Sequence, residues 1–392
     1  MLRDKYQFNY EFIKRLSFYY GYMRTENLIQ SLKTHTSTIS VRVNTQFTTA
    51  AKLLEAFVEK DIPAKQHPVL KEAILIDINE ASSIPRKDKV ATLNYYRSVN
   101  KVLLGSGLGA KDFIVPDDVN FGDEISLIDK KDNVVANGIL MMGVDEINAK
   151  KKGVAIKITD SKYKVPNLNG LKEFLRGHFI IQTIPNMLIG LMVNLKPKDR
   201  LMDMITRNGD ILSHIWQRNS KIDSKIIAID NSAHRLSKFD ETIKRLRMYK
   251  APIEKMQLNM RTFAQKFSKD ETFDWIIINP TSSETGLRPK IFEDVDEKNI
   301  LEMVVTQKEF MEHAARLIKR GGTIFYITSS IDPAENEEII SYAVDELELS
   351  IDEQEIFLGD KCQSTFEGSE LLQYFFPDKH DTPGQFIAKL TK

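Results

Sequence analysis

Four polar residues in the second half of the chain each follow a short apolar run, where a ligand site could form. They are Asp203, Asp230, Asn279 and Ser329. Ligands of open α/β sheets bind just beyond the carboxyl ends of the strands, so residues in these places can do chemistry. An acid there can accept hydrogen bonds from ribose hydroxyls, and the pair Asp203 and Asp230 therefore suits a nucleoside ligand. A strand that ends in aspartate is common, so this pair alone is a weak indication.

The elements that would position these residues alternate between strand and helix after Pro166. Strands that alternate with helices of this length predict a mostly parallel, doubly wound sheet. We therefore expect an α/β, Rossmann-like domain over residues 167–392. The segments expected to form it are 200–205, 211–217, 225–229, 233–249, 275–278, 301–318 and 323–326.

Two further parts are predicted before this domain. Apolar side chains recur at helical spacing over residues 6–32 and 50–58, and strand-like patterns occupy 38–44 and 73–76. Short apolar runs separated by Gly, Asp and Asn follow, and they are typical of a small β-barrel-like domain. The expected divisions are an N-terminal helical and α/β region over 1–94 and a β-rich domain over 95–166.

The composition restricts the chemistry that the chain could perform. Its 392 residues include 55 Lys plus Arg and 55 Asp plus Glu, so no net charge draws it to nucleic acid or lipid, and RNA binding must be local. A single cysteine, Cys362, excludes an internal disulfide, a cysteine-based metal site and any two-cysteine mechanism. It fits a reducing compartment, and we expect the cytoplasm or, alternatively, the nucleus. No apolar run reaches the ~18 residues of a membrane span.

Motifs along most of the chain resemble those of the NOL/NOP/Sun (RsmB-type) family of RNA cytosine-5 methyltransferases. Residues 273–286 resemble the family's strand that ends in Asp-Ala-Pro-Cys-Ser-Gly-Thr-Gly, and residues 321–330 resemble its Gly-Gly strand that ends in Ser-Thr-Cys-Ser. Residues 41–45 resemble its N-terminal signature and 375–390 its closing hairpin. The resemblance implies a class I methyltransferase fold, S-adenosylmethionine as cofactor and RNA as substrate.

The β-rich segment resembles a PUA domain, the RNA-binding module of the family's tRNA-modifying subgroup. The resemblance is carried by Gly109-Ala110, Phe121-Gly122-Asp123, Ala136-Asn137-Gly138 and Lys152-Gly153, whereas Asp117 stands where the pattern usually has glycine. It implies binding at the acceptor end of tRNA, and a β-barrel without a ligand is the alternative. Candidate RNA contacts are Lys151, Lys152, Lys157 and Arg288, among further lysines at 130, 131, 150, 162 and 164. A solvated lysine face is the other interpretation of that cluster.

The catalytic positions that the resemblance implies have lost their chemistry. Family members attack the cytosine ring with a cysteine thiolate, and the corresponding residue here is Ser329. The second family cysteine, which helps release the product, corresponds to Ser282, and the aspartate that supplies a proton corresponds to Asn279. A serine hydroxyl needs a dedicated base, which no pattern in the sequence supplies. Cys362 matches neither cysteine position and is expected to be a small core residue.

The cofactor loop also departs from the family pattern Ala-Ala-Pro-Gly-Gly-Lys-Thr. The corresponding residues, 206–212, retain only Gly209. Asp210 would place a negative charge where a helix N-terminus should receive the methionine carboxylate, and Ile211 replaces the lysine. Asn259 replaces the acid that contacts adenine, which leaves Asp203 and Asp230 as the familiar cofactor-side groups. Binding of S-adenosylmethionine is therefore expected to be weak or lost.

Three functions remain open on the sequence. The favoured hypothesis is a catalytically inactive RNA-binding homologue, directed to tRNA. The second is a non-catalytic subunit that pairs with an active methyltransferase, with the acidic stretch 332–355 as its docking surface. The third is a residual S-adenosylmethionine-dependent RNA methyltransferase with altered chemistry, because Asn279-Pro280-Thr281 distantly resembles the Asn-Pro-Pro motif of amino-group methyltransferases. The histidines are scattered, so no metal site is expected.

Overall fold

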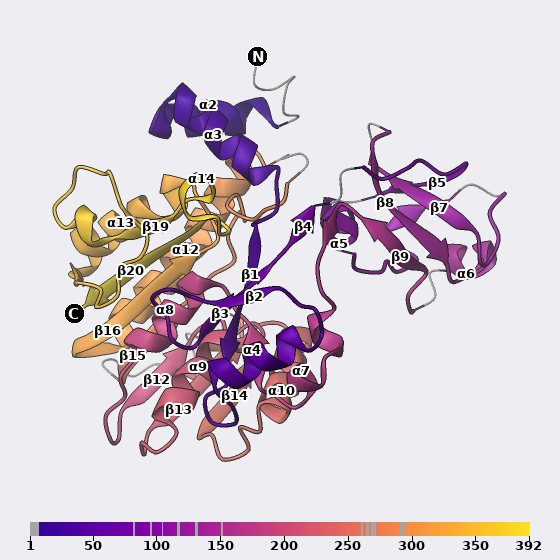
Figure 1. The fold of residues 1–392 in the computed structure, drawn as a ribbon. Helices are drawn as coiled ribbons and strands as arrows, with labels where there is room; N and C mark the ends of the chain where they lie inside the picture. Colours follow the sequence, from indigo (N-terminus) through magenta and orange to yellow (C-terminus); the bar gives the residue numbers. More distant parts are fainter. Residues whose placement is uncertain are drawn as a thin grey trace.

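The chain forms a large α/β domain, a small N-terminal sheet that packs on it, and a separate β-rich domain (Figure 1). The computed structural model describes residues 8–80, 83–94, 96–103, 105–115, 118–129, 132–149, 152–259, 262–263, 266–267, 272–290 and 295–392. No helix in this described part of the chain is long and apolar enough to cross a membrane.

The α/β domain is built on a sheet with the strand order β14-β13-β12-β15-β16-β20-β19-β18, and β17 pairs with β20. The strands from β14 to β16 run parallel, whereas β20 runs antiparallel to β16. This arrangement confirms the Rossmann-like fold and adds an antiparallel edge to it. The strands are β12 (Arg200–Asp203), β13 (Lys225–Asp230), β14 (Ile253–Gln257), β15 (Phe273–Ile278), β16 (Ile318–Thr328), β17 (Ser350–Ile351), β18 (Asp360–Lys361), β19 (Gln373–Phe375) and β20 (Gln385–Thr391).

Helices cover both faces of this sheet because both faces of its strands are apolar. Met202 packs into one core cluster with α12 and α13, and its neighbour Leu201 packs into another with α8 and α9. Side-chain caps fix where helices begin: Ser232 accepts a hydrogen bond from the Arg235 amide, which starts α10. The helices are α8 (Ile184–Met192), α9 (Asp210–Asn219), α10 (Ala233–Arg245), α12 (Glu297–Leu317), α13 (Glu337–Leu347) and α14 (Pro377–His380).

The helical pattern expected over residues 6–32 forms two helices, α2 (Tyr10–Tyr20) and α3 (Tyr22–Leu32). Gly21 separates them with a φ of 76°, a conformation that glycine adopts readily. Their buried faces join the core of the α/β domain and not that of the N-terminal sheet, and α3 packs beside α14 (Figure 1). The N-terminal helices are therefore part of the large domain's core.

The N-terminal sheet has the strand order β11-β1-β3-β2. Its edge strand β11 comes from a segment that was expected in the α/β domain over residues 167–392. The chain pairs with the free edge of β1 when it returns from the β-rich domain. The strands are β1 (Thr38–Val43), β2 (Ala64–Gln66), β3 (Ala73–Asp77) and β11 (Phe179–Ile181), and the accompanying helices are α4 (Ala50–Val58) and α7 (Lys172–Leu175).

The β-rich domain is a five-stranded sheet of order β6-β5-β7-β8-β9. Its first strand, β5, lies before residue 94, where the boundary was expected, and pairs with β7. A ribbon of two antiparallel strands, β4 and β10, carries the chain into and out of this domain. The elements are β4 (Asn79–Glu80), β5 (Lys89–Leu93), α5 (Tyr96–Leu103), β6 (Phe113–Ile114), β7 (Glu124–Ile128), β8 (Val134–Leu140), α6 (Val144–Asn148), β9 (Ile156–Ser161) and β10 (Tyr163–Lys164).

Buried polar side chains join the N-terminal sheet to α9. The guanidinium of Arg42, fully buried on β1, donates to the Ser213 hydroxyl at 2.9 Å. The ring of His214 lies 2.9 Å from a carboxylate oxygen of Glu72, and the Gln217 amide donates to the other oxygen at 3.1 Å. Burial lowers the pKa of His214 to about 4. The ring is therefore neutral near pH 7 and donates to a charged Glu72.

This neutral histidine makes stability depend on pH. Because an unfolded histidine titrates near 6.5 and the folded one near 4, the unfolded chain binds more protons between these values. Stability is complete above pH 6.5 and falls as the pH drops toward 4. We expect a loss of about 2 kcal/mol between pH 7 and pH 5 from this group. His214→Gln, whose amide can still donate to Glu72, should reduce that loss in urea unfolding curves.

The control is His234→Gln, since His234 is exposed on α10. That variant should retain the pH dependence of the unmodified protein. If His214→Gln also retained it in full, the ring would not be neutral in the folded state.

Candidate functional site

The four residues singled out in the sequence lie at the carboxyl ends of neighbouring strands of the sheet. Asp230 ends β13, Asp203 ends β12, Asn279 follows β15 and Ser329 follows β16. These strands are consecutive neighbours in the sheet and run parallel. The arrangement is the one in which α/β proteins bind ligands.

Asp230, the expected ribose acceptor, is already occupied by protein donors. The Arg235 guanidinium, one turn into α10, donates to both carboxylate oxygens at 2.9 and 3.0 Å. The backbone amides of Arg207 and Ser232 donate to the same carboxylate at 3.0 and 2.8 Å. A ribose hydroxyl would have to displace a charge-assisted hydrogen bond, which is about twice as strong as a neutral one.

The other two acids at this end of the sheet are buried, one of them within the cofactor loop. Burial raises the pKa of Asp203 well above its usual range, and the nearby Asp210 and Asp230 add to that effect. Asp210 opens α9, and its carboxylate accepts a hydrogen bond from the Asn186 amide at 2.8 Å. The helix N-terminus thus already holds an acid of the chain where an anionic ligand would bind.

Gly209 and Asn259 have structural roles in their loops. Gly209 has a φ of 75°, and a Cβ on it would lie 2.0 Å from the ring of Phe239, so only glycine fits. The side chain of Asn259 accepts a hydrogen bond from the Thr262 amide at 2.9 Å, and the Thr262 hydroxyl accepts from the Asn259 amide at 3.0 Å. Neither residue presents a charged group to a cofactor.

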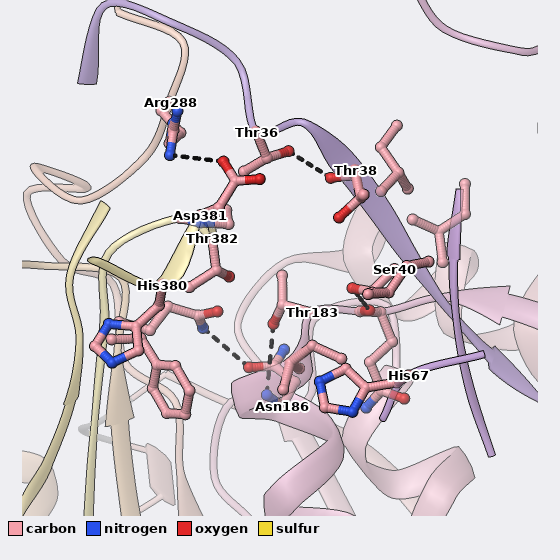
Figure 2. Close-up of a pocket in the computed structure, with 18 of the residues that line it drawn as sticks. Thr36, Thr38, Ser40, His67, Thr183, Asn186, Arg288, His380, Asp381 and Thr382 are labelled. Carbon is pink, nitrogen blue, oxygen red and sulfur yellow. Dashed lines mark hydrogen bonds and ion pairs between the residues drawn. The ribbon is translucent and has the colours of Figure 1, made fainter. Parts of the chain in front are cut away.

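A cavity of about 770 Å³ lies between this edge of the sheet and the N-terminal sheet (Figure 2). Ser329, Asn279 and Asp210 line it on the side of the α/β domain. The Asn279 carbonyl accepts a hydrogen bond from the Arg207 guanidinium at 3.4 Å. Among the described residues, no histidine or carboxylate accepts a hydrogen bond from the Ser329 hydroxyl, so no base is in place to activate it.

Hydroxyl groups bind the loop after β15 to the loop after β16. Thr285 and Ser330 share a hydrogen bond of 2.9 Å, and the Ile331 amide donates to the Thr285 hydroxyl at 3.1 Å. Ser282 lies in this loop but does not line the cavity; its hydroxyl accepts from the Glu284 amide at 3.4 Å. These hydrogen bonds fix the two loops relative to each other.

The single cysteine of the chain lies elsewhere. Cys362 is buried in the C-terminal part of the sheet, with its sulfur 3.2 Å from a carboxylate oxygen of Glu337. Burial and that carboxylate raise the pKa of the thiol to about 12. The thiol is therefore protonated at neutral pH and packs as a core residue, as the sequence predicted.

The comparison with protein families decides the ancestry of this site. Residues 190–391 match the family described as 16S rRNA methyltransferase RsmB/F, and residues 12–81 match the ferredoxin-like domain of the RsmF/B type. The chain belongs to the RsmB/F methyltransferase family. Members of this family depend on S-adenosylmethionine and modify RNA cytosines, so RNA and that cofactor are the ligands of the family.

Similar RsmB/F family proteins include tRNA methyltransferases. The chain is 30% identical over 389 residues to a tRNA (cytosine(72)-C(5))-methyltransferase from Pyrococcus horikoshii, covering 97% of each. It is 23% identical to the human tRNA (cytosine(72)-C(5))-methyltransferase NSUN6, covering 81% of this chain and 74% of that protein. The crystal structure of NSun6 from Pyrococcus horikoshii with SFG matches with a TM-score of 0.85 and 28% identity over 99% of both chains.

The expected RNA contacts differ in their exposure. Lys152 and Lys157 are exposed on the β-rich domain, whereas Lys151 lies outside the described residues, as do lysines 130, 131 and 150. Arg288 lines the cavity with a side chain that is 5% exposed, and its guanidinium donates to the carbonyl oxygens of Thr34, His35 and Pro377 at 2.8 to 3.0 Å. Arg288 therefore holds the N-terminal segment against the family domain and is not a free contact for RNA.

Several residues of the site gave no clear signal in the sequence. Arg235 could have been suspected, because an arginine one turn into the helix after a strand-ending acid can reach back to that acid. Asn186 could not have been suspected. Nor could the cavity residues of the N-terminal sheet, because β11, the last strand of that sheet, follows a separate domain in the sequence.

The cofactor loop predicts the effect of removing one charge. We expect unmodified protein to bind S-adenosylmethionine more weakly than micromolar, an affinity worth about 8 kcal/mol. Asp210→Asn should tighten binding roughly tenfold, because it removes the charge that opposes the ligand carboxylate and keeps an acceptor for Asn186. Isothermal calorimetry measures both. Glu241→Gln, at an exposed ion pair on α10, is the control and should have no effect. Micromolar binding by unmodified protein would contradict this account of the loop.

Proposed function

We propose that this chain is an RNA-binding member of the RsmB/F family, directed to tRNA, that has lost cytosine-5 methyl transfer. One observation carries the proposal: Ser329, which follows β16, corresponds by sequence resemblance to the family's nucleophilic cysteine, while the only thiol of the chain is buried at Cys362. A free cysteine thiol has a pKa of ~8.5, within reach of activation, whereas a serine hydroxyl reacts only when a base removes its proton.

The groups around Ser329 support the loss of activity. Asn279 cannot supply the proton that the family aspartate supplies, and its carbonyl already accepts from Arg207. Asp230 is clamped by Arg235, and Asp210 adds negative charge at the start of α9. Changes at the nucleophile, the proton donor and the cofactor loop are separate, so reverting one of them leaves the others in place.

RNA binding is supported by the intact scaffold and by the β-rich domain. Its sequence resembles a PUA domain, and its exposed Lys152 and Lys157 offer positive charge for phosphates. The relatives from Pyrococcus horikoshii and human are tRNA methyltransferases, and this supports tRNA, bound at its acceptor end, as the ligand. The lone cysteine supports a reducing compartment such as the cytoplasm.

The alternative of a docking subunit is left with the later part of the acidic stretch, where Glu338, Asp345, Glu346 and Glu348 are exposed, because its first acids are buried. In the acidic stretch 332–355, Asp332, Glu335 and Glu337 are buried. The Asp332 carboxylate accepts from Arg15 of α2, and Glu335 accepts from the Gln307 amide at 2.9 Å. The beginning of the stretch therefore contributes to the internal packing of the domain and does not present acids to a partner methyltransferase subunit.

If the lysines of the β-rich domain contact phosphates, RNA affinity should fall steeply with salt. Each contact contributes about 0.7 to 0.9 to the slope of log affinity against log salt. Replacing both Lys152 and Lys157 with alanine should lower the affinity for tRNA and reduce the slope by about 1.5 in filter-binding titrations. The matched control replaces Lys196 and Lys221, exposed residues that precede β12 and β13 and so lie near the amino ends of these strands, away from the cavity. Equal effects of the two double variants would remove the β-rich surface from the proposal.

The loss of catalysis predicts that restoring the nucleophile is not enough. Unmodified protein and Ser329→Cys should both fail to transfer label from methyl-tritiated S-adenosylmethionine to tRNA, because Asn279 and the cofactor loop remain unsuited. Ser329→Ala should bind tRNA as the unmodified protein does, since no covalent step passes through the hydroxyl. The Pyrococcus horikoshii relative serves as the positive control for the assay. Label in tRNA with unmodified protein would overturn the proposed inactivity.

A further inference from the structure

Helices α2, α12 and α13 meet on the outside of the α/β domain. Helices α12 and α13 pack side by side over one core cluster, which the N-terminal helices also join (Figure 1). Arg15 of α2 donates to the carboxylate of Glu297, at the start of α12, at 3.1 Å. The hydroxyl of Tyr19, one turn further along α2, donates to Glu338 of α13 at 2.9 Å. These two contacts fix the three helices relative to each other.

A furrow runs between α12 and α13 from this junction. The hydroxyl of Tyr342, one turn after Glu338, donates to Glu312 of α12 at 2.7 Å, and Nζ of Lys308 lies 4.4 Å from the centre of the Tyr342 ring. Residues three and four apart share one side of a helix. The stripe of α12 that begins at Glu297 and reaches Glu312 therefore borders the furrow along its whole length.

Large apolar side chains of this stripe are open to solvent. Leu301 and Val305, one and two turns after Glu297, are 50% and 61% exposed, and Phe18 of α2 is 83% exposed. A single exposed apolar residue is ordinary, whereas several along one furrow indicate contact with another molecule. The surface formed by these side chains and their neighbours is called here the three-helix surface. It consists of Phe18, Tyr19, Leu301, Val305, Glu338 and Tyr342.

A pocket of about 440 Å³ continues the three-helix surface beyond the start of α13. Phe18, Tyr19 and Glu338 belong to its lining, and the rings of Phe366 and Phe376 form further walls. Clefts of ~300 to 1,000 Å³ hold ligands as large as a drug molecule, so this pocket can take a large side chain of a bound partner.

The charge of the furrow restricts what could occupy it. Helix α13 carries four acids and neither lysine nor arginine, and Glu338, Asp345 and Glu346 among them are exposed. Glu302 and Glu309 are exposed on α12. Such a negative face repels the phosphates of RNA and of anionic lipids, and it attracts a positively charged partner.

Two cations line the pocket, but they do not offset this field. The guanidinium of Arg24 lies 4.2 Å from the centre of the Phe376 ring, and 3.9 and 4.0 Å from carboxylate oxygens of Asp360 and Asp378. Lys361 directly follows Asp360 on β18. Acids thus accompany both cations, and the negative field of α13 and the outer side of α12 remains.

We propose that the three-helix surface docks a basic amphipathic helix of a protein partner. Apolar side chains of that helix would pack on Leu301, Val305 and Phe18, and its lysines or arginines would lie opposite the acids of α13. A furrow between two packed helices accepts a third helix whose apolar residues recur at helical spacing. The inference goes beyond RNA binding and does not depend on it, because no residue of this surface lines the cavity.

The test uses synthetic peptides of about 18 residues, with leucine at helical spacing and lysine elsewhere. Fluorescence anisotropy measures their binding to the full chain. Unmodified protein should bind this amphipathic peptide at least roughly tenfold more tightly than a scrambled peptide of the same composition, because only the helix presents one apolar face. A peptide with glutamate in place of lysine should bind more weakly than either.

Variants of the surface separate the apolar from the charged contribution. Leu301→Ala combined with Val305→Ala should weaken binding of the leucine and lysine peptide roughly tenfold, because it removes the apolar contacts. Glu338→Gln combined with Glu346→Gln should weaken binding and flatten its dependence on salt, since fewer charges attract the peptide. Glutamine at position 338 still offers an acceptor to the Tyr19 hydroxyl.

The matched control is Val58→Ala combined with Leu175→Ala. These residues lie on α4 and α7 beside the N-terminal sheet and are 70% and 64% exposed, comparable with the pair on α12. This variant should bind the peptide as unmodified protein does. Thermal unfolding should give similar melting temperatures for both alanine pairs, since exposed side chains contribute little to stability.

Other occupants of the furrow would show themselves in the same variants. Equal binding of the amphipathic and scrambled peptides, or undiminished binding by the Leu301 and Val305 variant, would overturn the proposal. A dimer in sedimentation velocity that this variant loses would assign the furrow to a second copy of the chain. Lower tRNA affinity in the variant would assign it to RNA. Binding to vesicles of phosphatidylcholine and phosphatidylserine that the variant loses would assign it to lipid. Each of these three results would contradict a basic protein partner and leave the proposed RNA binding standing.

Discussion

A fully buried guanidinium sets the relation between the N-terminal sheet and the α/β domain. Removing the Arg42 charge from water is costly, and the Ser213 hydroxyl is the only side-chain acceptor recorded for it among the described residues. Burial lowers its pKa to about 9, while Glu72 and Asp210 favour the charged form. The two carboxylates and the helix that carries Ser213 must stay close to Arg42, and this fixes the second wall of the cavity. The interaction defines geometry more than it adds stability.

The cofactor loop and the cavity respond to this constraint together. Asp210 faces a buried cation on one side and the Asn186 amide on the other, so the acid that opposes a cofactor carboxylate is useful to the packing of α8 and α9. Arg235 holds Asp230 in the same way. Protein side chains thus satisfy the carboxylates of Asp230 and Asp210 at the carboxyl ends of the strands. Fold alone does not fix function, so activity has to be judged from the groups at this site.

The strands of the large domain could be predicted because buried parallel strands are continuous apolar runs, as in residues 226–229 and 276–278. The placement of the four polar residues followed from the topology of such sheets. The clamp on Asp230 could not be predicted, since it depends on the rotamer of Arg235. The contribution of Gln182 to the cavity wall could not be predicted either, because Gln182 follows β11, which pairs with β1 only after the chain has formed the β-rich domain. The partners of Arg288 could not be predicted either, since its donors reach carbonyls of the N-terminal segment, which is distant in the sequence.

The burial of the only thiol has a consequence for oxidative stress. Peroxide attacks the thiolate form of cysteine, so an enzyme that depends on an accessible thiolate is silenced when its nucleophile is oxidised. Here the sulfur of Cys362 is buried beside Glu337 and protonated, and Cys362 does not line the cavity. Serine at position 329 has no comparable oxidation chemistry. No cysteine lines the cavity, so under the proposed function RNA binding there should not depend on the redox state of the cell.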